Sequence, residues 1–336
     1  MNSKPKIILR GDGNSEIGLG HLYRLLALAE MLKEDFNILF LTHTSSETKP
    51  IISAGFKVQT IDKSIDLHQE AYWIKTKFLD TSIIILDGYH FDEQYQKSLK
   101  MNGLKIAYID DLMQGKVQAN VIINHAPYAK KMLYNAGTNT TFALGLDYAI
   151  LRPAFLKASQ QKTIEDRKNN VFVSFGGADP NNYTLLVCQA LIGFSQIENI
   201  HVVIGASAKN KLVENLAIDY PQIKIHKNLN ATEMLKLMQV SNLAIVPSSN
   251  ILFELLAVKT KILSGYYVEN QKYIYDSFLK RNVIFPLGDL TKINVESLKL
   301  SILESIKSDN SIIDRQAQLF TSDVKKNYIE LIKTLC

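Results

Sequence analysis

Short apolar runs alternate with amphipathic stretches along this chain, and that alternation is the feature that most constrains its fold. The runs have the length and β-branched content of buried strands, and the stretches between them carry apolar residues at helical spacing. Strands that alternate with helices form parallel sheets with crossover helices. The predicted strands are Lys6–Arg10, Phe36–Thr42, Ile83–Asp87, Lys105–Asp110 and Val121–Asn124, then Val171–Phe175, His201–Ile204, Lys224–His226, Leu243–Val246 and Lys261–Leu263.

The polar stretch Ala158–Asn170 interrupts the alternation, which then starts again. A chain of 336 residues is long enough for two domains that each bury their own core. We therefore predict two doubly wound α/β domains, residues 1–157 and 171–290, with further helices in 291–336. The predicted helices are Gly20–Lys33, Leu67–Leu79, Asp92–Met101, Asn182–Phe194, Ala208–Ile218, Ala231–Val240, Ile251–Val258, Val295–Ser308 and Ser311–Leu335.

Composition and charge argue against several classes of protein. The net charge is +5, but Lys and Arg are scattered and form no dense basic stripe, so nucleic acid is not an expected partner. No apolar run approaches the length of a membrane span, and no secretory signal precedes the first strand, so a cytoplasmic location is expected. Cys188 and Cys336 lie far apart and in no ligand spacing, which predicts neither a disulfide framework nor a zinc site.

The glycine-rich segment GDGNSEIGLGH, residues 11–21, follows the first predicted strand and opens the first predicted helix. It matches neither the Rossmann dinucleotide fingerprint nor the Walker loop. Gly18 and Gly20 would let a ligand approach the backbone closely. His21 lies in the first helical turn, where the positive end of the dipole disfavours the imidazolium. Since a neutral imidazole can accept a proton, His21 is a candidate general base; the alternative is that it only caps the loop.

A second glycine turn follows the first strand of the second predicted domain. Gly176 and Gly177 end that strand, and Asp179 begins the next predicted helix. Backbone N–H groups at such a turn form an anion site suited to a diphosphate. The alternative is an ordinary tight turn with an aspartate as the helix N-cap.

A later strand-to-helix turn in the same domain carries hydroxyl groups and a carboxylate. Ser248 and Ser249 precede the helix, and Glu254 lies one turn inside it. Hydroxyls and free N–H groups suit phosphate oxygens, and a carboxylate can accept hydrogen bonds from both ribose hydroxyls. The alternative is a serine cap with an incidental glutamate. Together with the glycine turn, this segment predicts a nucleotide site.

Polar residues also follow three strands of the first predicted domain, at Asp87, Tyr89 and His90, at Asp110 and Asp111, and at Asn124 and His125. In doubly wound sheets, ligands bind outside the carboxyl ends of the strands, and with two such domains the cleft between them is the expected site. Asp110 and Asp111 lack the further ligands of a metal site, so none is predicted.

In order along the chain, the segments IGLGH…R, DGY, DD, N-x-A, FGGADPNN, SSN…E and ENQ resemble the UDP-sugar hydrolase family of pseudaminic acid biosynthesis (PseG). That family is similar to the spore-coat polysaccharide protein SpsG and the lipid-linked glycosyltransferase MurG. The resemblance covers roughly Lys6–Pro286. It implies the glycosyltransferase B-type (GT-B) fold and metal-independent hydrolysis, without a cofactor, of UDP-2,4-diacetamido-2,4,6-trideoxy-β-L-altropyranose to UDP and the free sugar.

The resemblance also implies roles for individual residues, with His21 as the catalytic residue. The implied substrate-binding residues are Gly18, Gly20, Arg24, Tyr89, Asn124, Asn250, Asn270 and Gln271, and the UDP-binding residues are Gly176, Gly177, Asp179, Ser248, Ser249 and Glu254. Family members often carry Asn-Glu where this chain has Phe253-Glu254, so that asparagine's contact must come from elsewhere, from Asn250 or Asn270.

Two other functions remain open at this point. One is a GT-B glycosyltransferase that passes the sugar to an acceptor, for which KKMLY at Lys130–Tyr134 is a faint candidate for membrane docking. The other is a nucleotide-sugar-binding protein without turnover. The sequence carries no signal for an oligomeric state.

Overall fold

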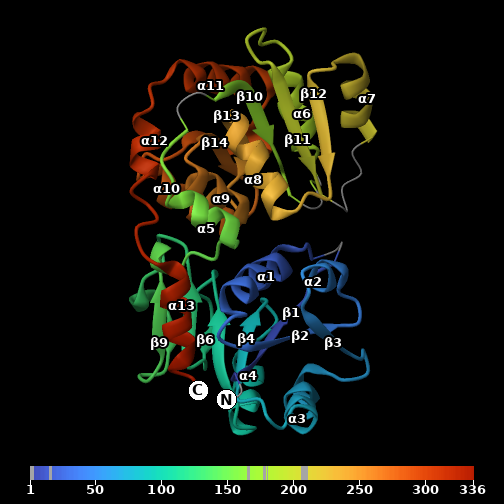
Figure 1. Ribbon diagram of the computed structural model, residues 1–336, viewed down its shortest axis with the longest axis vertical. Helices are drawn as coiled ribbons and strands as arrows, with labels where there is room; N and C mark the ends of the chain where they lie inside the picture. The colour runs from blue at the N-terminus through green and yellow to red at the C-terminus, as the bar shows by residue number, and fades with distance from the viewer. Residues whose placement is uncertain (1–3, 15–16, 165–166, 177–178, 180, 206–210) are drawn as a thin grey trace. The chain divides into compact units, whose positions relative to one another are not determined.

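The computed structural model describes residues 4–14, 17–164, 167–176, 179, 181–205 and 211–336. By their internal contacts these residues form two compact units (Figure 1). Unit 1 comprises Met1–Pro153 and Ser322–Cys336, and unit 2 comprises Ala154–Thr321. The predicted C-terminal segment 291–336 is therefore divided, because its last helix belongs to unit 1.

Unit 1 is built around a parallel sheet whose described strands are β1 (Lys6–Gly11), β2 (Asn37–His43), β3 (Lys57–Ile61), β4 (Ile83–Asp87), β5 (Lys105–Ile109), β7 (Val121–Asn124) and β9 (Thr141–Leu144). The strand order is β3-β2-β1-β4-β5-β7-β9. The order reverses between β1 and β4, which pair in parallel with Gly11 opposite Asp87. In open α/β sheets, the carboxyl ends of the strands at such a reversal form the usual ligand site.

The helices of unit 1 connect and cover these strands. They are α1 (Gly20–Leu32), α2 (Lys49–Ser53), α3 (Leu67–Lys77), α4 (Glu93–Met101) and α13 (Val324–Lys333), with the 3-10 turns η1 (Lys131–Leu133) and η2 (Leu146–Tyr148) and a small ladder of β6 (Lys116–Val117) and β8 (Asn135–Ala136). Asp66 and Asp92 cap α3 and α4 by accepting backbone N–H groups. The C-terminal helix α13 packs against α1 and η2, and buried Tyr328 donates to the Tyr148 carbonyl at 2.7 Å.

Unit 2 repeats the plan with the described strands β10 (Lys168–Val173), β11 (Asn199–Ile204), β12 (Ile223–Lys227), β13 (Ser241–Pro247), β14 (Lys261–Tyr266) and β15 (Phe285–Asp289). They pair in parallel in the order β12-β11-β10-β13-β14-β15. The helical segments are α5 (Pro153–Ser159), α6 (Tyr183–Leu191), α7 (Lys211–Asp219), α8 (Ala231–Val240), α9 (Asn250–Val258), α10 (Glu269–Leu279), η3 (Leu290–Lys292), α11 (Val295–Lys307) and α12 (Ser311–Gln316).

The central strands are apolar on both faces because helices cover both faces of a parallel sheet. Ile83, Ile84, Ile85 and Leu86 of β4 are all fully buried. Each unit has its own cluster of buried apolar side chains, as expected for a separate core.

The predicted α/β class with two parallel sheets is confirmed, and each predicted strand overlaps an observed one. The sequence did not predict the edge strands β3, β9 and β15 or the helices α2, α5 and α10. The single helix predicted at Ser311–Leu335 is wrong: α12 ends at Gln316, and Asp323 begins α13 by accepting the Lys326 N–H. The predicted helix start at Ala208 lies outside the described residues.

Candidate functional site

His21 lies at the reversal of the unit 1 sheet, directly beside the last residue of β4. It is the second residue of α1, and its Nδ1 lies 2.7 Å from Oδ1 of Asp87. A carboxylate can only accept hydrogen bonds, so in this contact Nδ1 donates and Nε2 is left as the acceptor nitrogen; Nη2 of Arg24 also lies 3.3 Å from Nδ1. The His21 side chain retains 16% of its exposure, whereas the Asp87 side chain has none. An aspartate that fixes the ring and stabilises the imidazolium is the arrangement of a histidine general base.

Arg24 lies one turn further along α1 and binds the same carboxylate through two nitrogens. Its Nε donates to Oδ2 of Asp87 at 2.7 Å, and its Nη2 donates to Oδ1 at 2.5 Å. Burial alone would raise the pKa of Asp87, but Arg24 and His21 outweigh that effect and hold it below its usual value. Asp87 is therefore ionised. This buried carboxylate beside His21 could not be predicted from the sequence pattern around the helix start.

Asp111 extends this cluster from the loop that follows β5. Its Oδ2 accepts a hydrogen bond from Nη1 of Arg24 at 2.8 Å and one from the Tyr89 hydroxyl at 3.4 Å. Tyr89 is 49% exposed, and its ring meets the His21 ring edge-on, with centroids 4.9 Å apart. Tyr128 donates to the Asp111 carbonyl at 2.8 Å. The predicted residues His21, Arg24 and Tyr89 are thus brought together.

The glycine-rich segment leads into this cluster. Gly18 has a φ of +81°, which favours glycine, and a Cβ atom at Gly18 or Gly20 would meet no atom within 4 Å. Gly11 has a different role, because a Cβ atom there would lie 2.8 Å from the Asp87 carbonyl oxygen. Glycine at that position lets β1 lie close to the end of β4.

Asn124 was predicted to bind substrate, and the structure places its side chain in contacts within its own loop. It is 1% exposed; its Nδ2 donates to the Tyr134 hydroxyl, and its Oδ1 accepts from the Ala126 backbone N–H. Both polar groups therefore stabilise the loop after β7. Its neighbour His125 is buried too, and its Nδ1 accepts from the Ile150 backbone N–H, which makes it a structural histidine.

A second buried ion cluster lies in the same unit and was not predicted from the sequence. Arg10 of β1 donates to Glu70 of α3 at 2.8 Å and to Asp12 at 2.6 Å. Asp12 also accepts the His43 backbone N–H at 2.6 Å, and Tyr95 donates to Glu70. These contacts tie the loop that begins at Asp12, and leads toward His21, to the ends of neighbouring strands. No local sequence signal pairs Arg10 with a glutamate sixty residues away.

In unit 2, the start of α9 holds the predicted hydroxyl groups. Ser249 is the N-cap but makes no side-chain capping hydrogen bond, and Asn250 is the first helical residue. Ser248 is fully buried, and its hydroxyl pairs with the Ser264 hydroxyl at 2.8 Å. Glu254 is partly exposed, one turn inside the helix. The N–H groups that begin α9 thus lack a side-chain acceptor from the N-cap, which suits an anion.

The glycine turn after β10 is arranged differently from the predicted diphosphate site. Asp179 is 6% exposed, and its two oxygens accept the Tyr183 and Thr184 N–H groups, each at 2.9 Å. The aspartate therefore caps α6 itself and neutralises that helix end. Gly176 has a φ of +82° and is exposed. Gly177 lies outside the described residues.

Asn270 and Gln271 occupy the first turn of α10, after β14. Val268 is the N-cap of α10, and its apolar side chain makes no capping hydrogen bond. Gln271 is 7% exposed, and its Oε1 accepts the Tyr267 N–H at 3.2 Å, so this amide shapes the turn. Strands β13 and β14 pair with Pro247 opposite Gly265, which puts the starts of α9 and α10 at the same edge of the sheet.

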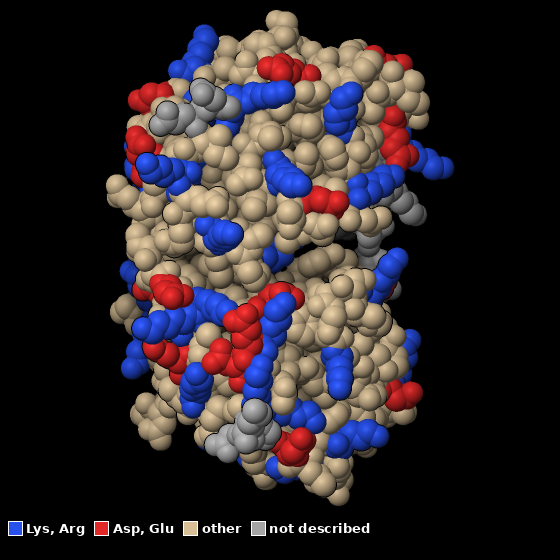
Figure 2. All heavy atoms as spheres, in the orientation of Figure 1, with Lys and Arg blue, Asp and Glu red and all other residues tan. Residues whose placement is uncertain are grey.

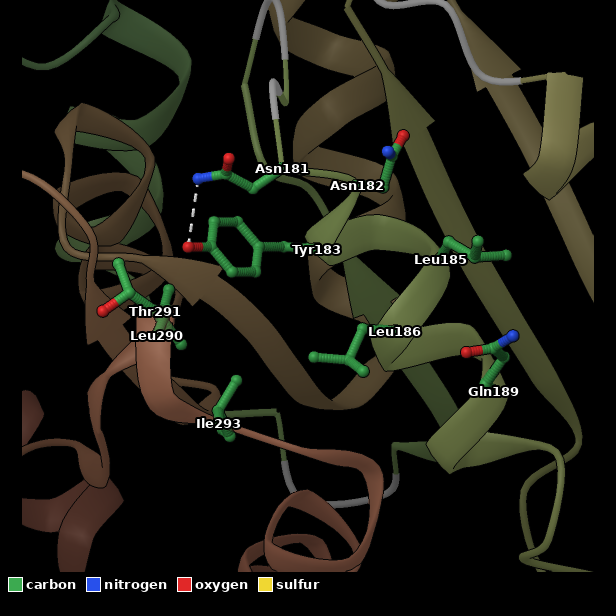
Figure 3. Close-up of a pocket in the computed structure, with 9 residues that line it drawn as sticks. All are labelled: Asn181, Asn182, Tyr183, Leu185, Leu186, Gln189, Leu290, Thr291 and Ile293. Atoms are coloured by element: carbon green, nitrogen blue, oxygen red, sulfur yellow. Dashed lines mark hydrogen bonds between the residues drawn. The ribbon is translucent and has the colours of Figure 1, made fainter.

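A cavity of about 490 Å³ opens against the first turns of α6 in unit 2 (Figure 3). In that view Asn181 points toward the Tyr183 hydroxyl, 3.2 Å away, while Leu186 and Ile293 supply apolar surface. No charged side chain is among the described residues that line it. Because a diphosphate needs cationic or N–H partners, this cavity is not the anion site suggested by the open helix starts.

Lys and Arg are interspersed with Asp and Glu over the face drawn in Figure 2. Among the described residues, no three or more His, Cys, Asp or Glu side chains gather as a metal site would require. No helix in the described part of the chain is long and apolar enough to cross a bilayer.

The chain has distant relatives of known sequence, although no protein-family model matches it. It is 26% identical to the uncharacterized protein MJ1062 of Methanocaldococcus jannaschii, over 97% of this chain and 72% of that protein. It is 26% identical to the UDP-2,4-diacetamido-2,4,6-trideoxy-β-L-altropyranose hydrolase of Campylobacter jejuni, over 80% of this chain and 93% of that one. It is 28% identical to the spore coat polysaccharide biosynthesis protein SpsG of Bacillus subtilis, over 82% of each.

Solved structures agree with the fold at much lower sequence identity. MurG of Acinetobacter baumannii has a TM-score of 0.68 at 11% identity, over 99% of this chain and all of that one. Medicago truncatula UGT71G1, complexed with UDP-glucose, has a TM-score of 0.66 at 11% identity, over 99% of this chain and 98% of that one. The chain thus has the GT-B fold and is a distant homologue of the altropyranose hydrolase and of SpsG.

Proposed function

We propose that this protein processes a nucleotide sugar, and that it is a hydrolase releasing UDP from UDP-2,4-diacetamido-2,4,6-trideoxy-β-L-altropyranose or a close relative of that sugar. The observation that carries the proposal is the His21–Asp87 pair, because it supplies an oriented base at the ligand-binding edge of unit 1. The distant relationship to a hydrolase with this substrate in its name supports the choice of substrate.

We assign the nucleotide to unit 2. At the starts of α9 and α10 the N-cap residues make no side-chain capping hydrogen bond, the two starts lie at one sheet edge, and Glu254 lies one turn inside α9. Helix N-termini favour phosphate, and a carboxylate can accept both ribose hydroxyls. Ser249 and Asn250 lie at the α9 start, whereas Asp179 lies at a helix end that it already neutralises, so a UDP role for Asp179 is the weakest of the predicted set.

The reaction follows from the acceptor nitrogen of His21. Nε2 takes a proton from a water molecule as the water oxygen forms a bond to the anomeric carbon. The bond between that carbon and the phosphate oxygen breaks, and UDP leaves with the electron pair. Asp87 stabilises the imidazolium, which then returns the proton to solvent. Since UDP is a stable anion, no strong general acid is required on the leaving group.

Hydrolysis in ¹⁸O-labelled water tests this proposal. Attack at the anomeric carbon puts ¹⁸O into the released sugar and none into UDP, and release needs no acceptor. Label in the β-phosphate of UDP would contradict the assigned bond cleavage. Absence of release without an acceptor would contradict hydrolysis.

A glycosyltransferase is the second candidate, and one observation favours it. The turn η1 exposes Met132 by 83% and Leu133 by 48% beside Lys130 and Lys131, a surface suited to an anionic membrane that carries a lipid acceptor. A transferase would use the same base to deprotonate an acceptor hydroxyl instead of water. UDP release that depends on added lipid acceptor would identify this reaction.

A further inference from the structure

The ionised side chains around His21 form a buried cluster with a defined charge. Asp87 and Asp111 each contribute a carboxylate, and Arg24 contributes one guanidinium, with exposures of 0%, 9% and 6%. Two negative charges and one positive charge leave a net charge of −1 when His21 is neutral. A proton on His21 therefore brings the cluster to neutrality. Burying a charge is costly unless an opposite charge balances it.

The contacts also link these residues in a closed ring that includes the aromatic side chains of His21 and Tyr89. His21 binds Asp87, Asp87 binds Arg24, Arg24 binds Asp111, and Asp111 accepts the Tyr89 hydroxyl. The edge-on contact between the Tyr89 and His21 rings completes this ring of contacts. Asp111 is the member that touches both the buried guanidinium and the exposed tyrosine, yet no hydrogen bond joins it to His21 among the described contacts.

We propose that Asp111 is a positioning residue for the reaction. Its carboxylate supplies the second negative charge that makes His21 an effective base, and it holds Tyr89 against the His21 ring. The inference rests on the proposed role of His21. Without the Asp111 carboxylate, Arg24 would be matched by Asp87 alone. A proton on His21 would then leave a buried net charge of +1, which opposes protonation.

The adjacent carboxyl group of Asp110 provides a matched comparison. Its Oδ1 accepts the Leu112 and Met113 backbone N–H groups, and it has no hydrogen bond to Arg24 among the described contacts, although the two groups interact electrostatically. Burial raises the pKa of Asp110 above its ordinary value. The titratable groups that interact with Arg24, Asp87 or Asp111 include His21, Tyr89, Tyr108, Asp110, His125, Tyr128 and Tyr328.

The test follows the protonation of His21 directly, without substrate. In full-length protein with ¹³C-labelled histidine, the His21 resonance is identified by its loss in His21→Asn and titrated against pH. We expect the titration midpoint of Asp111→Asn to move about one pH unit lower, with Asp110→Asn unchanged. The acid limb of the kcat/KM profile for UDP release should move in the same direction, because the base stays neutral to lower pH.

Asp111→Glu separates charge from position and remains informative if the asparagine variant fails to fold. It keeps the negative charge, so the midpoint should stay near that of the wild type while KM rises as Tyr89 loses its partner. A wild-type midpoint in Asp111→Asn, or an equal shift in Asp110→Asn and Asp111→Glu, overturns the proposal. The titration needs no turnover, so failure of the wild type to release UDP contradicts the proposed function alone.

Discussion

A substitution of Asp179 tests whether this residue caps helix α6 or binds the nucleotide. Its carboxylate accepts two backbone N–H groups at the start of α6, each at 2.9 Å, and its own φ is +41°. Asparagine tolerates this left-handed conformation and keeps one acceptor oxygen, but it loses the charge that opposes the helix dipole. That charge is worth about 0.3–1 kcal/mol.

Alanine at this position loses more. Removal of a side chain that accepts N–H groups at a helix start costs about 0.5–2 kcal/mol, and a left-handed residue with a Cβ but no polar group adds about 1–2 kcal/mol. We therefore expect Asp179→Asn to destabilise the start of α6 by about 1 kcal/mol and Asp179→Ala by about 2–4 kcal/mol.

Hydrogen–deuterium exchange of peptides that cover α6 measures this loss locally, and a calorimetric titration measures UDP affinity. The Tyr183 and Thr184 amides should exchange faster in both variants, by about tenfold for each 1.4 kcal/mol. UDP affinity should be unchanged or higher, because a negative charge near the assigned diphosphate site has been removed. Asp66→Asn, which changes a similar cap on α3 in unit 1, is the matched control.

Exchange at α6 that does not change, together with UDP binding at least about tenfold weaker, would refute this reasoning and restore Asp179 as a ligand. Unchanged binding in Asp66→Asn would show that such an effect is specific to Asp179.

Three further expectations concern other parts of the chain. Burial raises the pKa of the Cys188 thiol to about 12, while Cys336 is exposed, so a thiol reagent should label the native protein once and the unfolded protein twice; two rapid labels would contradict this burial. Glu254→Ala should weaken UDP binding as its main defect, by about tenfold if two hydrogen bonds to ribose are lost, and an unchanged dissociation constant would exclude the ribose role. The pKa of Asp87 is lower in the folded protein than in the unfolded chain, where it is near 4, so ionised Asp87 stabilises the fold at pH values above about 4. This stabilisation is lost as the pH falls, so the wild-type Tm should drop in acid more steeply than the Tm of Asp87→Asn.

Most of the strands that the sequence predicted carry continuous apolar runs. Ile83–Asp87 reads as a buried strand because both faces are covered, and its observed bounds are the same. The edge strand Lys57–Ile61 has mixed polar and apolar residues, so its pairing with β2 decides its structure. The local sequence pattern does not indicate which strand this segment pairs with.

The candidate site shows the same division. His21, Arg24 and Tyr89 could be predicted from the sequence because each lies in a short motif that resembles the hydrolase family. The contact of His21 with Asp87, and that of Arg24 with Asp111, depend on how α1 crosses the sheet and could not be read from spacing. Asp179 shows a further limit of the sequence pattern: a glycine turn before a helix suggests an anion site whether or not a carboxylate already binds the N–H groups of the helix start.

UDP release by the wild type and by His21→Asn, measured alongside UDP affinity, tests the central claim most directly. We predict rapid release by the wild type without acceptor or added metal, and a loss of at least about a hundredfold in kcat for His21→Asn. His68→Asn, which changes an exposed histidine of α3, should behave as the wild type. UDP affinity should be nearly unchanged in both variants. Full turnover by His21→Asn, with weaker UDP binding as its defect, would contradict the assignment of His21 as the base.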